Sequence, residues 1–137
     1  MNTPNKTLRN TPQRQLVLET VRSNTNHPTA DEIYDLARER DPLISKGTVY
    51  RNLNLLYSLN EIQKLSMPYG PDHYDFNLAK HYHFICRSCC KVVDAELSYE
   101  DSFNNVEADL PGYKTEWHRL VFVGLCPECI KKIEEEN

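Results

Sequence analysis

Apolar residues recur at helical spacing in the first third of the chain. Leu16, Leu18 and Val21 follow Thr11-Pro12, a pattern that predicts a helix beginning near the proline. A second helix opens at Thr29, because Glu32 completes a capping box in which each residue bonds the other's backbone N–H. The buried stripe expected for this second helix is Ile33, Leu36 and Ala37.

A third helix is predicted to start at Ser45, whose hydroxyl can cap free backbone N–H groups. Ile44 and Val49 are spaced to form a hydrophobic staple across that cap. Its apolar face comprises Val49, Leu53 and Leu56, and its opposite face carries groups that can reach DNA phosphates and base edges, namely Lys46, Thr48, Tyr50, Arg51 and Asn52. A hairpin expected over Ile62–Phe76 would complete a winged helix-turn-helix, although a generic helical domain also fits the pattern.

In the second half of the chain, the spacing of apolar residues changes from that of helices to that of strands. Strands are predicted at His83-Phe84-Ile85, at Val92-Val93 and over Tyr113–Leu125. Between them, Ser98 is expected to cap a helix whose apolar face is Phe103, Val106 and Leu110, and a charged helix is expected at Ile130–Glu136. The chain is therefore predicted to be α+β, with a winged-helix DNA-binding domain over residues 1–76 and a small dimerisation and metal-binding domain over residues 77–137. So small an amphipathic unit commonly completes its core by forming a homodimer.

Composition limits where the chain works. With 137 residues, 39% of them hydrophobic, it can bury one core or two small ones. The polar start, Met1–Arg9, resembles no signal peptide, and the longest apolar run, Leu120–Cys126, is too short to cross a bilayer, so a cytoplasmic protein without a membrane partner is expected. In a reducing compartment the cysteines are expected to act as metal ligands rather than to form disulfides, and the alternative is an oxidised, secreted module.

Charge is distributed unevenly. The formal net charge is −4, but Met1–Ser66 carries nine Lys or Arg against seven Asp or Glu, whereas Met67–Asn137 carries seven against thirteen. Because DNA contact depends on a local basic face, the acidic total does not exclude it. Ordinary solvated surface is the alternative interpretation of the same charges.

Two sets of metal ligands lie in the second half. Cys86/Cys89 and Cys126/Cys129 form two C-x-x-C pairs, which suit a closed tetrahedral zinc site. Imidazoles and carboxylates instead suit Fe(II) or Mn(II), and two such histidines spaced two apart on a strand project from one face. These harder ligands are Asp75, His81, His83 and Asp94. The sequence thus predicts a structural zinc site beside a responsive metal site.

Four ordered motifs resemble the ferric uptake regulator (Fur) family of metal-responsive repressors. They are H-P-T-A-D-E-I-Y at 27–34, G-T-V-Y-R-N-L at 47–53, H-Y-H-F-I-C-R-S-C at 81–89 and C-P-E-C at 126–129. The resemblance spans nearly the whole chain. It implies an N-terminal winged helix, a C-terminal dimerisation domain and a two-fold dimer on a palindromic double-stranded DNA operator.

Within that family the ligand set is most similar to PerR-type peroxide sensors, since Asp94 stands where iron-sensing members usually have Glu. The resemblance implies a regulatory Fe(II) or Mn(II) site made by His27, Asp75, His81, His83 and Asp94. It also implies that hydrogen peroxide oxidises His27 or His81 when Fe(II) is bound, which weakens metal binding and releases DNA. Mn(II) is expected to support DNA binding without this reaction.

Several alternatives remain at this level. Arg51 is similar to the operator-reading residue of iron sensors, whereas some peroxide sensors have Asn there. The nearest alternative function is an iron- or manganese-responsive repressor without peroxide sensing. A non-haem iron enzyme and a structural zinc-ribbon adaptor are more distant possibilities. Cys90 stands where the family generally has Gly, and either it or Cys89 can supply the fourth thiolate. His73 and His118 are unassigned, and a further metal site of classical Fur proteins is expected to be incomplete, because Lys80 and Tyr82 flank His81.

Overall fold

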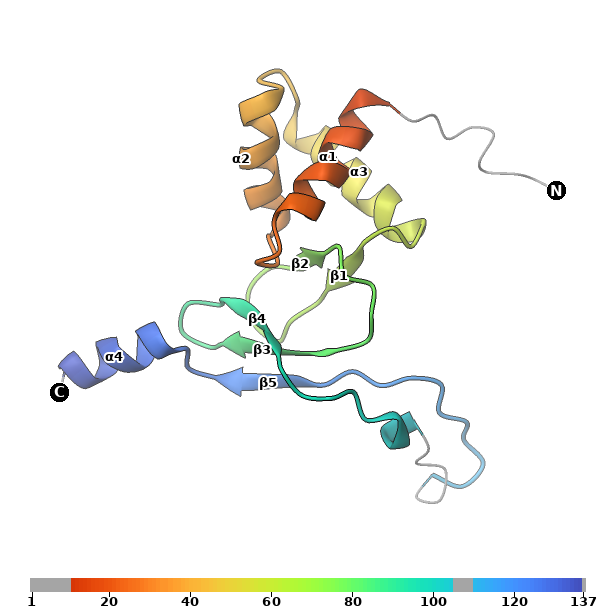
Figure 1. The fold of residues 1–137 in the computed structure, drawn as a ribbon, viewed down its shortest axis with the longest axis vertical. Coiled ribbons are helices and arrows are strands. Elements are labelled where there is room, and N and C mark those ends of the chain that lie inside the picture. Colours follow the sequence, from red (N-terminus) through yellow and green to blue (C-terminus); the bar gives the residue numbers. More distant parts are fainter. Residues whose placement is uncertain (1–10, 105–109, 137) are drawn as a thin grey trace. The chain divides into compact units, whose positions relative to one another are not determined.

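The computed structural model describes residues 11–104 and 110–136 (Figure 1). The chain divides into two compact units. The first contains Met1–Ser66 and Pro71–Leu78, and the second contains Met67–Gly70 and Ala79–Asn137. Both helices and sheets are present, so the predicted α+β class is confirmed.

Three helices build most of the first unit, and each begins at a side-chain cap. Helix α1 spans Pro12–Ser23, α2 spans Ala30–Arg40 and α3 spans Lys46–Ser58. The Thr11 hydroxyl accepts from the Arg14 N–H at the start of α1, and the predicted Thr29–Glu32 capping box is present in full at α2. These caps satisfy backbone N–H groups that have no partner within the helix.

The core of the first unit lies between the three helices. Within the described part of the chain it comprises eleven buried residues, and Val49, Leu53 and Leu56 of α3 are fully enclosed in it. Ser45 caps α3 by accepting from the Thr48 N–H at 3.1 Å, and the flanking Ile44 is also buried in this core, as the staple predicts. Burial of the apolar face leaves the opposite side of α3 in solvent.

A short antiparallel hairpin completes this unit. Strand β1, Gln63–Leu65, pairs with β2, His73–Asp75, in the register Gln63↔Asp75. Three helices followed by a two-stranded sheet are the elements of a winged helix-turn-helix. An isolated bridge between Thr29 and His73 joins the hairpin to the segment that precedes α2.

The second unit is built on a three-stranded sheet in the order β4-β3-β5. Central strand β3, Tyr82–Cys86, is antiparallel to β4, Val92–Ala95, and parallel to β5, Val121–Gly124. The predicted strand over Tyr113–Leu125 is wrong for most of its length. Helix α4 spans Pro127–Glu136 and begins three residues earlier than the sequence predicted.

The helix expected after Ser98 is represented among the described residues by a 3₁₀ turn, η2, at Asp101–Asn104. Phe103 is 48% exposed and Leu110 is 44% exposed, so neither forms the buried stripe that was predicted. Val106 lies outside the described residues. None of the helices in the described ranges is long and apolar enough to cross a membrane.

Candidate functional site

Four cysteine sulfurs converge in the second unit. Those of Cys86, Cys89, Cys126 and Cys129 lie within 4.8 Å of one another. Cys86 ends β3, Cys89 lies in the turn that follows, and the other pair brackets the start of α4. Four thiolates brought together by two short turns are the donor set of a closed tetrahedral zinc site, so the residues present fit zinc.

The local backbone prepares one of these sulfurs to bind a metal. The Cys89 N–H donates to the Cys86 sulfur at 3.5 Å, and this interaction is the largest of those that lower the pKa of Cys86 from 9.0 to about 6. Burial acts in the opposite direction and is outweighed. Because the thiolate is the form that binds zinc, the turn favours the ligand state of this thiol.

Cys90 has a different environment from the four clustered cysteines. Its φ is +64°, the left-handed region in which glycine is the usual residue. Its N–H donates to the Cys86 carbonyl oxygen at 2.8 Å and closes the turn between the two strands. Of the neighbouring residues Cys89 and Cys90, Cys89 is the one whose sulfur belongs to the four-sulfur group.

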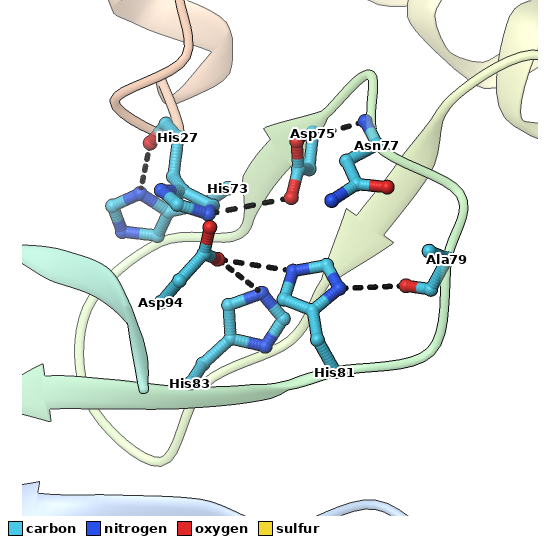
Figure 2. Close-up of polar contacts among 8 residues, drawn as sticks. All are labelled: His27, His73, Asp75, Asn77, Ala79, His81, His83 and Asp94. Atoms are coloured by element: carbon cyan, nitrogen blue, oxygen red, sulfur yellow. Dashed lines mark hydrogen bonds and ion pairs between the residues drawn. The ribbon is translucent and has the colours of Figure 1, made fainter. Parts of the chain in front are cut away.

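A histidine and a carboxylate meet within the first unit. Nε2 of His27 lies 3.3 Å from Oδ2 of Asp75, and both residues are buried (Figure 2). His27 precedes α2, and Asp75 is the last residue of β2. The Asn77 N–H donates to Oδ1 of Asp75 at 3.0 Å, which orients the carboxylate.

Two histidines and a carboxylate meet within the second unit. Oδ1 of Asp94 lies 3.0 Å from Nε2 of His81 and 3.5 Å from Nε2 of His83 (Figure 2). The sheet register explains this convergence, because Asp94 on β4 is directly opposite His83 on β3, and His81 lies two residues before His83. Nδ1–H of His81 donates to the Ala79 carbonyl oxygen at 2.6 Å and so directs Nε2 toward the carboxylate.

Nitrogen and carboxylate donors of this kind fit Fe(II) or Mn(II), whereas the four sulfurs fit zinc. The structure thus has two chemically distinct donor sets, as the sequence predicted. A backbone carbonyl that accepts from the second ring nitrogen is a common support for a metal-binding histidine, and His81 has one.

The comparisons with known proteins identify the family. The model of the ferric uptake regulator family matches residues 5–123. The chain belongs to this family. The resemblance to this family that the sequence motifs indicated is therefore confirmed. The prediction of a regulator rather than an enzyme is confirmed as well, since Fur-family members are DNA-binding transcriptional regulators.

Relatives within the family include peroxide regulators. The chain is 37% identical over 125 residues to the peroxide operon regulator of Bacillus subtilis, a match that covers 91% of this chain and 86% of that protein. The Helicobacter pylori ferric uptake regulator, described as having three functional metal binding sites, is similar in structure with a TM-score of 0.79 and 26% identity, covering 92% and 85% of the two chains. The Campylobacter jejuni peroxide stress regulator has a TM-score of 0.67 and 27% identity, covering 86% and 89%.

His118 of this Fur-family chain is surrounded by hydroxyl and amide groups. Its Nε2 lies 2.9 Å from the Tyr82 hydroxyl, and its Nδ1 lies 3.1 Å from the Tyr99 hydroxyl and 2.7 Å from Oδ1 of Asn104. The ring also stacks on Tyr99 with a centroid distance of 4.5 Å. Both ring nitrogens therefore have hydrogen-bonding neighbours in this part of the unit.

The polar side of α3 shows how the candidate DNA-reading residues are held. The Tyr50 hydroxyl donates to Oδ1 of Asp31 at 2.6 Å, and Nζ of Lys46 lies 3.4 Å from the same oxygen. These two contacts hold the pKa of Asp31 below its ordinary value, and the hydrogen bond from Tyr50 has the larger effect. Asp31 could not be predicted as part of this surface from the sequence, because the contact joins residues on two helices that only the tertiary fold brings together.

Arg51 and Asn52 both bond to Thr48. The guanidinium of Arg51 donates to the Thr48 hydroxyl at 3.1 Å, and the Asn52 amide donates to the Thr48 carbonyl oxygen at 2.8 Å. A Cβ at Gly47 would lie 3.1 Å from Nη1 of Arg51, so a side chain there would shift the guanidinium by a few tenths of an ångström. Lys46, Tyr50 and Arg51 are exposed, as contact with DNA requires.

Proposed function

We propose that this Fur-family chain is a metal-dependent DNA-binding repressor that responds to hydrogen peroxide. The observation that carries the proposal is the pairing of Asp94 with His81 and His83 across the β3–β4 ladder, in a chain whose relatives include peroxide regulators. His27 and Asp75 supply a second group of the same chemistry in the first unit. In this proposal, all five residues bind one regulatory Fe(II) or Mn(II), and Cys86, Cys89, Cys126 and Cys129 bind structural zinc.

The mechanism follows from the position of the ligands in the chain. Residues 1–76 act as the winged-helix DNA-binding domain and residues 77–137 as the dimerisation domain. Because His27 and Asp75 belong to the first unit and the other ligands to the second, shared coordination restricts their relative orientation. Shifting the chain from conformations that mostly cannot bind DNA to conformations that mostly can requires about 5.5 kcal/mol of difference in metal-binding free energy between the two.

A homodimer is part of the proposal. Apolar side chains of the second unit are exposed in the single chain, and a second copy would cover them. They include Leu97, Trp117, Phe122 and Val123. A two-fold dimer presents two copies of α3, which suits a palindromic operator read in successive major grooves, with Lys46, Thr48, Tyr50, Arg51 and Asn52 as the DNA-binding residues. The proposed location is the cytoplasm.

Peroxide sensing depends on the residues that hold the regulatory metal. When Fe(II) is bound, it supplies the redox chemistry by which peroxide oxidises an adjacent ligand, and His27 and His81 are the proposed targets. The Ala79 carbonyl fixes the tautomer of His81, and the Asp75 carboxylate orients His27. Loss of either imidazole as a ligand weakens metal binding and releases the operator.

Peptide mass spectrometry tests this function. The Fe(II) and Mn(II) forms are prepared without oxygen, treated with equimolar hydrogen peroxide and compared for oxygen addition. One added oxygen on a His27 or His81 peptide in the Fe(II) form alone is the expected result. Intact histidines in both forms would instead indicate an iron- or manganese-responsive repressor, and oxidation at Cys90 alone would indicate thiol sensing.

A further inference from the structure

The backbone of His27 has an unfavourable conformation. Its φ is +58°, in the left-handed region that few residues other than glycine adopt. Such conformations persist where surrounding contacts enforce them, and they are concentrated at functional sites. His27 is 4% exposed, so those contacts come from the protein itself.

Strand β2 supplies the contacts that enforce this conformation. Nδ1–H of His73 donates to the His27 carbonyl oxygen at 2.6 Å (Figure 2). The Tyr74 N–H donates to the Pro28 carbonyl oxygen at 2.8 Å, and Thr29 forms an isolated bridge with His73. Of these contacts, the one from the His73 ring is the only one made by a side chain, so it depends on residue identity.

The chemistry of this contact is well defined. A carbonyl oxygen can only accept, so the proton resides on Nδ1 of His73. The ring is 6% exposed, and a buried hydrogen bond of this length is costly to lose, since the carbonyl would remain without its partner. His81 makes an equivalent contact with the Ala79 carbonyl at 2.6 Å, but there the ring orients itself, whereas His73 orients the backbone of another residue.

We propose that His73 is a positioning residue for the regulatory metal site, which holds the backbone of His27 in the left-handed conformation that directs its imidazole toward Asp75. The inference rests on the proposed function, in which His27 is a metal ligand. His73 itself contributes no metal ligand in this role. Its contribution is the Nδ1–H donor, in the way that groups hydrogen-bonded to a metal-binding residue orient that residue.

Two substitutions separate the hydrogen bond from packing. His73→Phe keeps an aromatic ring but removes the donor, and His73→Asn keeps an N–H near the position of Nδ1 but loses volume. Mn(II) affinity is measured by competition with a fluorescent chelator. We expect His73→Phe to weaken binding about tenfold, the lower end of the usual effect of substituting a residue that supports a metal ligand, and His73→Asn to recover most of that loss.

Controls distinguish positioning from a general loss of structure. Zinc content and the thermal midpoint are measured for every variant, and His118→Phe serves as a matched His-to-Phe change at the Tyr82–Tyr99 cluster. In a His27→Ala background, His73→Phe should cause no further loss of Mn(II) affinity, because the residue that it positions is absent. A merely structural role for His73 would still weaken binding in that background.

The outcomes are separable. If His27→Ala leaves Mn(II) affinity unchanged, His27 is no ligand and the proposed function itself fails. If His27→Ala weakens binding but His73→Phe does not, only the positioning role is refuted. Equal loss in His73→Phe and His73→Asn would also refute it, because the donor would then be irrelevant to the effect.

Discussion

Disrupting the four-cysteine site should unfold the second unit and leave the first unit folded. Among the described residues, the buried apolar cluster of the first unit contains eleven residues, whereas the cluster at the four-cysteine site contains three, and all three are cysteines. The second unit therefore relies on metal ligation at a place where the first relies on hydrophobic burial. Cys126→Ser, which removes one thiolate, is the perturbation.

The expected loss of folding free energy follows from this difference between the two units. Structural zinc contributes on the order of 10 kcal/mol of folding free energy, which is comparable with the entire stability of a typical domain, about 5–15 kcal/mol. Outside the cysteine cluster, the buried apolar side chains on β3 and β4 are those of Tyr82, Ile85 and Val92. Each contributes roughly 1.5–3 kcal/mol on burial, so they cannot replace the metal.

Hydrogen exchange measured by mass spectrometry is the assay, because it reports each unit separately. Peptides from β3 and β4 should lose protection in Cys126→Ser, while peptides from α1 and α3 should keep it. Cys90→Ser is the matched control, since its sulfur lies outside the four-sulfur group. Protection of β3 and β4 that survives complete loss of zinc would refute the reasoning.

Three further predictions address the first unit. Leu53→Ala should destabilise it by about 3 kcal/mol in urea unfolding, because the side chain is fully buried and truncation leaves a cavity, and a change below about 1 kcal/mol would contradict the described core. Thr29→Ala should cost about 1 kcal/mol in the same measurement by removing the cap of α2, and an unchanged midpoint would show that the capping box adds no stability. Asp31→Ala should lower the ratio of operator to non-specific DNA affinity about fivefold in fluorescence anisotropy, because Tyr50 and Lys46 lose their shared acceptor. Asp35→Ala, which removes the same charge from α2, should leave that ratio unchanged. Equal effects of the two changes would refute the role of Asp31 in holding Tyr50 and Lys46.

Local sequence signals predicted most of the first unit. The capping residues Thr29 and Ser45 and the apolar spacing of α3 agree with the structure, because caps and helical periodicity depend on neighbours along the chain. The C-x-x-C pairs likewise indicated a zinc site, since each pair needs only one short turn. Predictions were poorer between Ser98 and Val121, where none of the residues that the structure describes is buried and an alternating pattern alone does not decide whether a strand forms.

Tertiary structure decided how the predicted residues act together. The sequence by itself determined the family motifs, the helices and the two chemically distinct sets of ligand types. It did not show that Asp94 lies opposite His83, that Asp31 binds Tyr50, or that His73 holds the carbonyl of His27. These contacts depend on strand register and helix packing between distant segments, and those arise only when the chain buries its apolar residues and pairs its backbone groups.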